Sequence, residues 1–148
     1  MRAVLQRVQN AEVTSNGHVT GKIREGWLVF LGISKTDSSK DVDYLAQKII
    51  NLRAFPDSKG KMNLSIKDTK GDILVVSQFT LYGDCEKGRR PSFSLAAPAQ
   101  DAQSLYEQFV NVLQQFGFNT QTGAFQQDML VNLVNDGPVT FIIETPQK

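Results

Sequence analysis

Three segments near the N-terminus have the pattern of β-strands. Residues 1–8 alternate loosely between apolar and polar positions, and residues 11–23 do so on both sides of Asn16-Gly17, a dipeptide that tolerates the positive φ of a tight hairpin turn. Residues 27–33 form a continuous apolar run that is too short for a typical helix and rich in β-forming side chains. We expect a strand, a hairpin and a fully buried strand.

Two longer segments, residues 39–55 and residues 99–117, repeat apolar side chains at helical spacing. Ser38 or Ser39 is placed to cap the first helix, and Phe55 ends it because the residue before a proline is driven out of the helical region. Pro98 suits the first turn of the second helix, and Gly117 suits its C-terminal stop. The expected apolar stripes consist of Val42, Leu45, Ile49 and Leu52 in the first helix and Ala102, Leu105, Phe109, Val112 and Phe116 in the second.

The rest of the chain completes an α+β pattern. Residues 57–72 are polar with a short strand near 62–66, and residues 72–82 form a buried strand that turns polar near its end. Two further strands, 129–134 and 139–143, follow. Two main helices with about six or seven strands, and no βαβ alternation, predict a single α+β domain over 1–148 with a mixed or antiparallel sheet that is curled or closed into a barrel.

The composition excludes several classes of protein. The 148 residues include 16 Lys and Arg, 15 Asp and Glu, one histidine and one cysteine, with a net charge of +1. A balanced charge is not that of a generic polyanion binder, and His18 with Cys85 supplies neither an intramolecular disulfide nor the ligands of a structural zinc site. No apolar run reaches the ~20 residues of a membrane span, so we expect a cytoplasmic protein without metal or cofactor.

Positive charge gathers in one loop of the second half. Residues 1–70 carry 12 basic and 7 acidic groups, whereas residues 71–148 carry 4 basic and 8 acidic groups. Three of those four basic side chains are Lys87, Arg89 and Arg90. The cluster suits phosphate because arginine presents a planar fork of donors, and a solvated surface loop is the more common alternative.

Nucleophilic catalysis needs a Ser, Thr or Cys within reach of a base, and the suggestive segment is Ser77, Gln78, Phe79 and Thr80, where the strand of residues 72–82 turns polar. Polar residues at a strand end also commonly satisfy backbone groups, which is the alternative. The sequence has no Gly-x-Ser-x-Gly elbow, and His18, the only imidazole, is expected in a surface turn. Cys85 has no convincing partner, so we expect an incidental thiol.

The segment Asn135–Pro138 permits unusual backbone geometry between the last two strands. A Gly–Pro bond adopts the cis form at modest cost, and a cis Gly137-Pro138 bond would aim two successive carbonyls in nearly the same direction. Such a pair would accept hydrogen bonds from an amine without any charged side chain. The alternative, which backbone physics alone favours, is a tight hairpin turn.

Two motifs, SQFTLY at 77–82 and NDGPVT at 135–140, resemble those of the D-aminoacyl-tRNA deacylases, the chirality-proofreading enzymes of translation. The resemblance covers nearly the whole chain in order and spacing, including residues 1–8, 26–33, 45–55, 60–65, 87–93 and 105–110. One departure is FQQDM at 125–129, where Gln126 and Gln127 replace the small residues usual in the family, although Met129 is retained.

The resemblance implies a homodimer with a site shared between subunits. A cis Gly137-Pro138 motif is expected to reach from one subunit into the other, where its carbonyls hold the substrate's α-amino group, so that an L side chain clashes while D side chains and glycine fit. Arg7 matches the position that braces this motif. The implied partner is the 3′ end of D-aminoacyl-tRNA, and the candidates for its phosphate contacts are Lys87, Arg89 and Arg90.

The same resemblance places the ester site at Ser77, Gln78, Phe79 and Thr80, with the Phe79 N–H donating to the ester carbonyl. One view of the family makes Thr80 the nucleophile, and the other assigns activation of water to the 2′-OH of the terminal adenosine. Because an unassisted threonine hydroxyl is a poor nucleophile and no strong base is expected nearby, we favour the second view.

Two other functions compete with ester hydrolysis. A non-catalytic nucleic-acid-binding dimer related to the same family is the first alternative, but such relatives tend to carry a C-terminal extension, and this chain stops at Lys148 just after its last strand. A plain structural dimer leaves both motifs unexplained.

Overall fold

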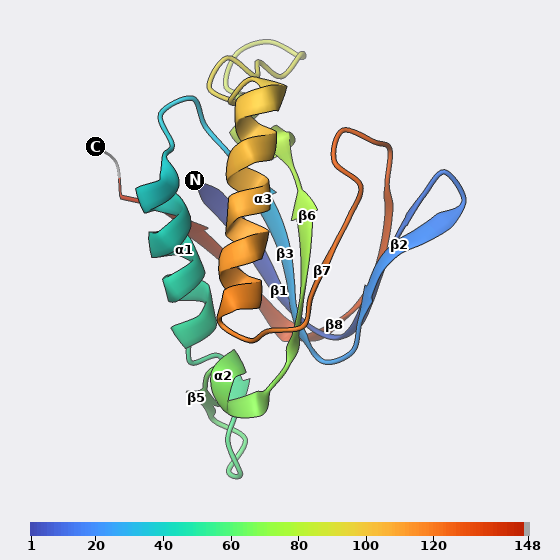
Figure 1. Cartoon of the computed structure of the whole chain (residues 1–148), viewed down its shortest axis with the longest axis vertical. Helices are drawn as coiled ribbons and strands as arrows, with labels where there is room; N and C mark the ends of the chain where they lie inside the picture. Colours follow the sequence, from blue (N-terminus) through green and yellow to red (C-terminus); the bar gives the residue numbers. More distant parts are fainter. Residues whose placement is uncertain (147–148) are drawn as a thin grey trace.

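The computed structural model describes residues 1–146, so the last two residues of the domain predicted over 1–148 lie outside the described part. A curled sheet carries two long helices on one face (Figure 1). The elements in chain order are β1 (Arg2–Ser15), β2 (His18–Ile23), β3 (Gly26–Gly32), α1 (Ser39–Asn51), β4 (Phe55–Pro56), β5 (Met62–Leu64), α2 (Ile66–Thr69), β6 (Asp72–Ser77), the 3₁₀ turn η1 (Phe79–Tyr82), α3 (Ala99–Gln115), β7 (Thr120–Thr122) and β8 (Leu130–Glu144).

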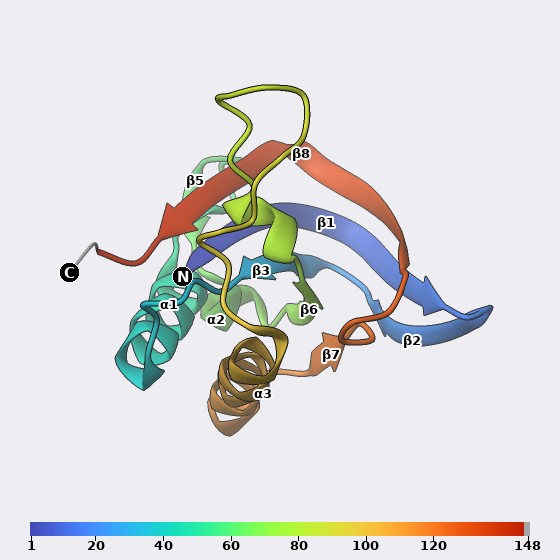
Figure 2. The same ribbon diagram turned by 90° about the horizontal axis from the view of Figure 1, so that it is seen from above.

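The sheet is mixed, as predicted. Its strand order is β2-β1-β3-β6-β7, with β8 on the outer side of β1. The β3–β6 and β6–β7 pairs are parallel, and the others are antiparallel. The two parallel connections contain α1 and α3, which therefore lie on the same face (Figure 2). The two outermost strands in this order, β2 and β7, lie close together and nearly close the sheet. A Cβ at Gly21 of β2 would lie only 2.5 Å from the Thr122 carbonyl oxygen of β7.

Two apolar cores hold this arrangement together. The larger lies between the sheet and the helices and contains fully buried Trp27, whose ring packs edge-on against Phe55 at 5.0 Å. The smaller lies inside the curl, where Val8, Leu28 and Leu74 are buried. Each core residue removes apolar surface from water, which is the main favourable contribution to folding.

The helix boundaries follow from local chemistry. Asp41 closes a capping box on Ser38, accepting its backbone N–H at 2.8 Å, and α1 buries three of its four predicted stripe positions. In α3 the predicted stripe is partly wrong. Phe109 is buried, but Phe116 is exposed, and the other fully covered positions are Tyr106, Val110 and Leu113. Tyr106 is buried because its hydroxyl finds a partner inside the protein, an option that apolar spacing does not register.

Three further expectations needed correction. Residues 66–69 form a short helix with a Ser65–Asp68 capping box instead of loop, and residues 79–82 form a 3₁₀ turn instead of continuing the strand. The hairpin expected at 135–138 is also wrong. Both halves of β8 run antiparallel to the same strand, β1, so the segment between them is a bulge. No helix within residues 1–146 is long and apolar enough to cross a membrane.

Candidate functional site

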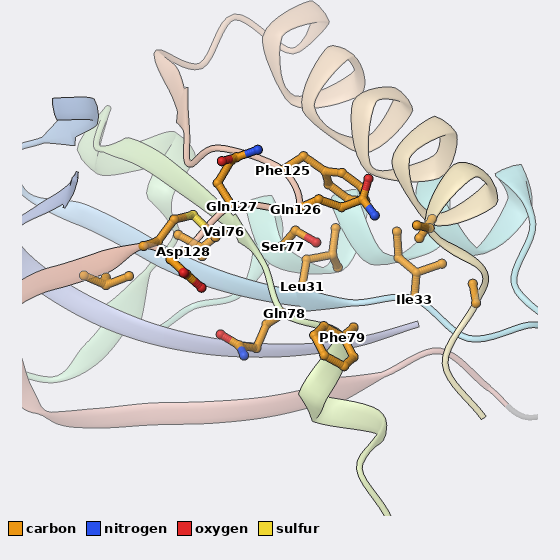
Figure 3. A pocket seen from close by; sticks show the side chains of 15 residues that line it. Leu31, Ile33, Val76, Ser77, Gln78, Phe79, Phe125, Gln126, Gln127 and Asp128 are labelled. Carbon is orange, nitrogen blue, oxygen red and sulfur yellow. The ribbon is translucent and has the colours of Figure 1, made fainter. Parts of the chain in front are cut away.

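An open cavity of about 580 Å³ lies at the C-terminal end of β6, where parallel strands leave side chains pointing out of the sheet. Ser77, Gln78 and Phe79 line it from one side, and the loop between β7 and β8 lines it from the other (Figure 3). Its floor is apolar and includes Leu31 and Val76. The structure thus brings three of the four predicted ester-site residues to one cavity.

The turn η1 sets the direction of these groups. The Gln78 N–H donates to the Leu31 carbonyl at 2.8 Å, which fixes the chain where it leaves the sheet. Phe79 is the first residue of the turn, so its N–H has no partner within the turn, and the residue lines the cavity. Thr80 is exposed and is not among the lining residues, and its hydroxyl accepts a hydrogen bond from the Gln78 amide.

Arg2 holds the turn η1 through a hydrogen bond to its backbone. Its Nη1 donates to the Leu81 carbonyl at 2.5 Å, its guanidinium lies 5.2 Å from the centroid of the Tyr82 ring, and its Nε pairs with Glu144 at 2.5 Å. Burial, together with the nearby charge of Asp37, raises the pKa of Tyr82 to about 12, so its hydroxyl stays protonated at neutral pH. Arg2 therefore connects the turn to the end of β8.

Two phenylalanine rings border the cavity, and each packs against a second aromatic ring that does not line it. Phe79 packs against Phe93 with ring centroids 4.9 Å apart, and Phe125 packs against Tyr106 at 5.6 Å. The buried Tyr106 hydroxyl donates to the Val75 carbonyl at 2.8 Å, and burial raises its pKa above the usual range. The Phe125 ring is therefore packed against a buried, hydrogen-bonded tyrosine, whereas Phe79, 56% exposed, contacts a second exposed ring.

The loop that carries Phe125 is anchored at both ends. Met129 packs so closely on Gly123 that a Cβ there would meet its sulfur at 2.6 Å. The Asn16 amide at the tip of the β1–β2 hairpin donates to Gln127 Oε1 at 3.4 Å. Met129, which the sequence retains from the family pattern and which we expect to support the site, lines the cavity together with Gln126 and Gln127, the two residues that depart from that pattern.

The Gly137-Pro138 bond is cis, and the segment around it bulges away from β1. Gln6 lies opposite Thr140 and Val8 lies opposite Asn135, so the single residue Arg7 faces the four residues 136–139. Both residues of the bond are exposed. Neither is among the residues that line the cavity of the same chain.

Arg7 braces this bulge from inside the protein. Only 8% exposed, it donates from Nη1 to the Ala54 carbonyl at 2.6 Å and from Nε to the Asp136 carbonyl at 3.2 Å, and it pairs with the Asp136 carboxylate at 2.9 Å. Asn135 closes the bulge, donating to the carbonyls of Arg7 and Val139 at 2.9 and 3.1 Å. A fixed segment is thus presented to the outside.

The remaining candidates lie outside the cavity. The basic cluster sits on an exposed loop closed by two backbone hydrogen bonds between Asp84 and Ser92, next to Phe93. His18 follows the Asn16-Gly17 turn and is exposed, as predicted, and Cys85 is a free, exposed thiol. Among residues 1–146, no group of three or more His, Cys, Asp or Glu side chains is placed to hold a metal ion.

Sequence reasoning missed Arg2, Tyr106 and Phe125 as parts of the site. Arg2 and Tyr106 bond to carbonyls 79 and 31 residues away in the chain, so no local pattern signals them. Phe125 begins the FQQDM segment that differs from the family pattern, and nothing in that segment indicates that its ring borders the cavity.

A family model described as D-Tyr-tRNA(Tyr) deacylase matches residues 4–144. Curated D-aminoacyl-tRNA deacylases from Geotalea uraniireducens and Thermosipho africanus are 58% and 56% identical, covering 99% and 98% of this chain and 95% and 97% of theirs. A solved structure named c-Myc DNA Unwinding Element Binding Protein is 41% identical with a TM-score of 0.94, covering 99% of this chain and 100% of its own. A probable eukaryotic D-amino acid tRNA deacylase, 17% identical with a TM-score of 0.82 over 96% of this chain and 97% of its own, shares the fold. The chain therefore belongs to the D-aminoacyl-tRNA deacylase family of hydrolases.

Proposed function

We propose that this protein acts in the cytoplasm, hydrolysing the ester of D-aminoacyl-tRNA, and of mischarged glycyl-tRNA, while leaving L-aminoacyl-tRNA intact. The observation that carries the proposal is the cavity at the end of β6, with Ser77, Gln78 and the free Phe79 N–H at its edge. A fixed backbone donor aimed into a cavity stabilises the negative charge that develops on an ester carbonyl oxygen during attack.

A second copy of the chain would supply the selectivity. The long strand β8 lies at the edge of the sheet and exposes apolar side chains, Leu130 at 72% and Ile142 at 69%. An uncovered edge of this kind favours pairing with another chain. In such a homodimer the braced carbonyls of Gly137 and Pro138 would enter the partner's cavity and accept hydrogen bonds from the α-ammonium. Rejection of the mirror-image centre needs fixed atoms, and this segment is fixed by Arg7.

The direct test is the loss of ester from D-tyrosyl-tRNA and L-tyrosyl-tRNA incubated with the purified protein. We expect release of D-tyrosine at a rate at least a hundredfold above that of L-tyrosine, because several kcal/mol separate a fitting centre from a clashing one. Equal rates would remove the selectivity. No release from either substrate, with tRNA still bound, would support the non-catalytic nucleic-acid-binding alternative.

Thr80 is expected to be positional. No carboxylate or imidazole of the described residues hydrogen-bonds to its hydroxyl, which already accepts from Gln78. Thr80→Ala should therefore keep turnover within about tenfold, whereas loss of an essential nucleophile costs on the order of a millionfold. A tRNA ending in 2′-deoxyadenosine should be cleaved far more slowly by the wild type. A trapped covalent aminoacyl-Thr80 species would contradict this assignment.

The basic loop is expected to contact RNA phosphates. Lys87, Arg89 and Arg90 are exposed on the loop that precedes Phe93, whose ring packs against the cavity residue Phe79. Replacing all three with Gln should weaken tRNA binding and reduce the slope of log K against log salt by about 2, since each single-strand phosphate contact contributes about 0.7. Replacing Lys59, Lys61 and Lys67 with Gln is the matched control, because these residues lie around β5 and α2, at the opposite end of the molecule from this loop (Figure 1). An unchanged slope in the first variant would show that the loop does not bind phosphate.

A further inference from the structure

We propose that Gln126 reads the edge of the substrate's terminal adenine and makes this cavity selective for adenine over other bases. The inference rests on the proposed function, because it assigns part of the same cavity to the nucleoside of the tRNA end. It concerns a side chain that ester hydrolysis itself does not require.

The cavity has the shape and chemistry of a nucleobase site. Phe79 and Phe125 lie on opposite sides of it, and Gln126 extends beside Phe125 (Figure 3). The wall near Gln126 is apolar and built from small side chains, Ala97, Ala99 and Ala102. Aromatic faces that accept a stacked base, together with few polar groups, are how proteins hold unpaired nucleotides.

Gln126 adopts a costly backbone conformation. Residues 124–127 form a turn closed by the Gln127 N–H, which donates to the Ala124 carbonyl at 3.4 Å, and Gln126 takes its third position with φ +57°. Glycine occupies such a left-handed position most easily, and a residue with a Cβ costs about 1 kcal/mol more there. Folding alone would favour glycine at this position, so the φ angle gives no structural reason for a glutamine, and the place of its side chain at the cavity edge is left to account for it.

The other polar side chains at the cavity are less suited to this role. The Gln78 Nε2 already donates to Thr80 and the Gln127 Oε1 already accepts from Asn16, so neither amide has both its donor and its acceptor free for one base edge. Asp128 has a carboxylate, which accepts hydrogen bonds but cannot donate one to adenine N7. The Gln126 amide makes no hydrogen bond within the described residues, and an amide can donate to N7 while accepting from the N6 amino group of the same base.

The experiment measures binding of adenosine 5′-monophosphate and of its 7-deaza analogue, which lacks the N7 acceptor, by NMR titration of the full-length protein. Wild type should bind the natural nucleotide about tenfold more tightly than the analogue and than cytidine 5′-monophosphate. Gln126→Gly should lose this preference, binding all three alike, and yet be at least as stable to denaturant, because glycine relieves the strained φ. Gln126→Glu should also become insensitive to the 7-deaza change, because a carboxylate cannot donate.

Lys70→Gly is the matched control, since Lys70 has φ +55° at the end of α2 and does not line the cavity. It should keep the full preference for adenine. A Gln126→Gly protein with the wild-type preference would overturn the inference, as would a wild type that releases D-tyrosine but binds all three nucleotides equally. Failure of the proposed function is distinguishable, because it appears as absent D-tyrosine release whatever the nucleotide preference.

Discussion

Gly137→Ala is expected to lower the release of D-tyrosine from D-tyrosyl-tRNA by about a hundredfold or more. A Cβ at this position would lie 1.9 Å from the Val139 backbone nitrogen and 3.1 Å from its Cα, so the chain on both sides must move. A displacement of about 1 Å in a group that positions substrate is enough to cost that factor. Single-turnover deacylation measures it directly.

The control for this change is Gly60→Ala. Gly60 has a positive φ of +74°, which strains an alanine, but nothing lies within 4 Å of its new Cβ. It should lose a little stability and no activity. If Gly137→Ala deacylated D-tyrosyl-tRNA as fast as Gly60→Ala, the bulge at residues 136–139 would have no part in holding substrate.

Arg7→Ala should reduce both stability and activity. The substitution removes a buried guanidinium that satisfies the Ala54 and Asp136 carbonyls and pairs with the Asp136 carboxylate. Loss of charged hydrogen bonds at a buried position costs about 3 kcal/mol in the free energy of unfolding, measured by urea denaturation. Deacylation by the protein that remains folded should also fall, because the bulge loses its brace.

Asp136→Asn separates the contribution of the Arg7 hydrogen bonds to the two carbonyls from that of its ion pair with the Asp136 carboxylate. Arg7 keeps its bonds to both carbonyls in this variant, and the Asp136 carboxylate is 41% exposed, so the loss should be below about 1 kcal/mol. An Asp136→Asn loss as large as that of Arg7→Ala would mean that the ion pair with the carboxylate, and not the bonds to the two carbonyls, holds the segment.

The pattern of neighbouring residues predicted those elements that are determined by interactions within a few residues of the chain. The α1 stripe, the Asn16-Gly17 turn and the buried strand at 27–33 all follow from spacing and turn chemistry within a few residues. The short helix at 66–69 had a readable signal as well, since Ser65 and Asp68 stand at capping-box spacing. The buried face of α3 differs from the predicted stripe because it includes Tyr106, whose hydroxyl donates to the Val75 carbonyl in the core.

The two motifs pointed to residues 77–82 as the candidate ester site and to residues 135–140 as the candidate selectivity segment, but not to how either segment is built. Whether residues 135–138 turn back on themselves or bulge depends on which strand their flanks pair with. That strand is β1, more than a hundred residues earlier. The same holds for the Phe125 loop, which becomes a wall of the cavity only because Tyr106 and Asn16 hold it there.

The α+β class, most strand and helix positions, and the near absence of titratable side chains suited to catalysis follow from the order of residues alone. Which groups meet follows only from the folded chain: Arg7 meets Asp136 and Ala54, Arg2 meets Leu81, and two aromatic rings face one cavity. The physical reason is the distance along the chain over which each interaction acts. Propensity and periodicity act within one or two turns of chain, whereas a site assembled from backbone carbonyls and N–H groups exists only after distant strands have paired.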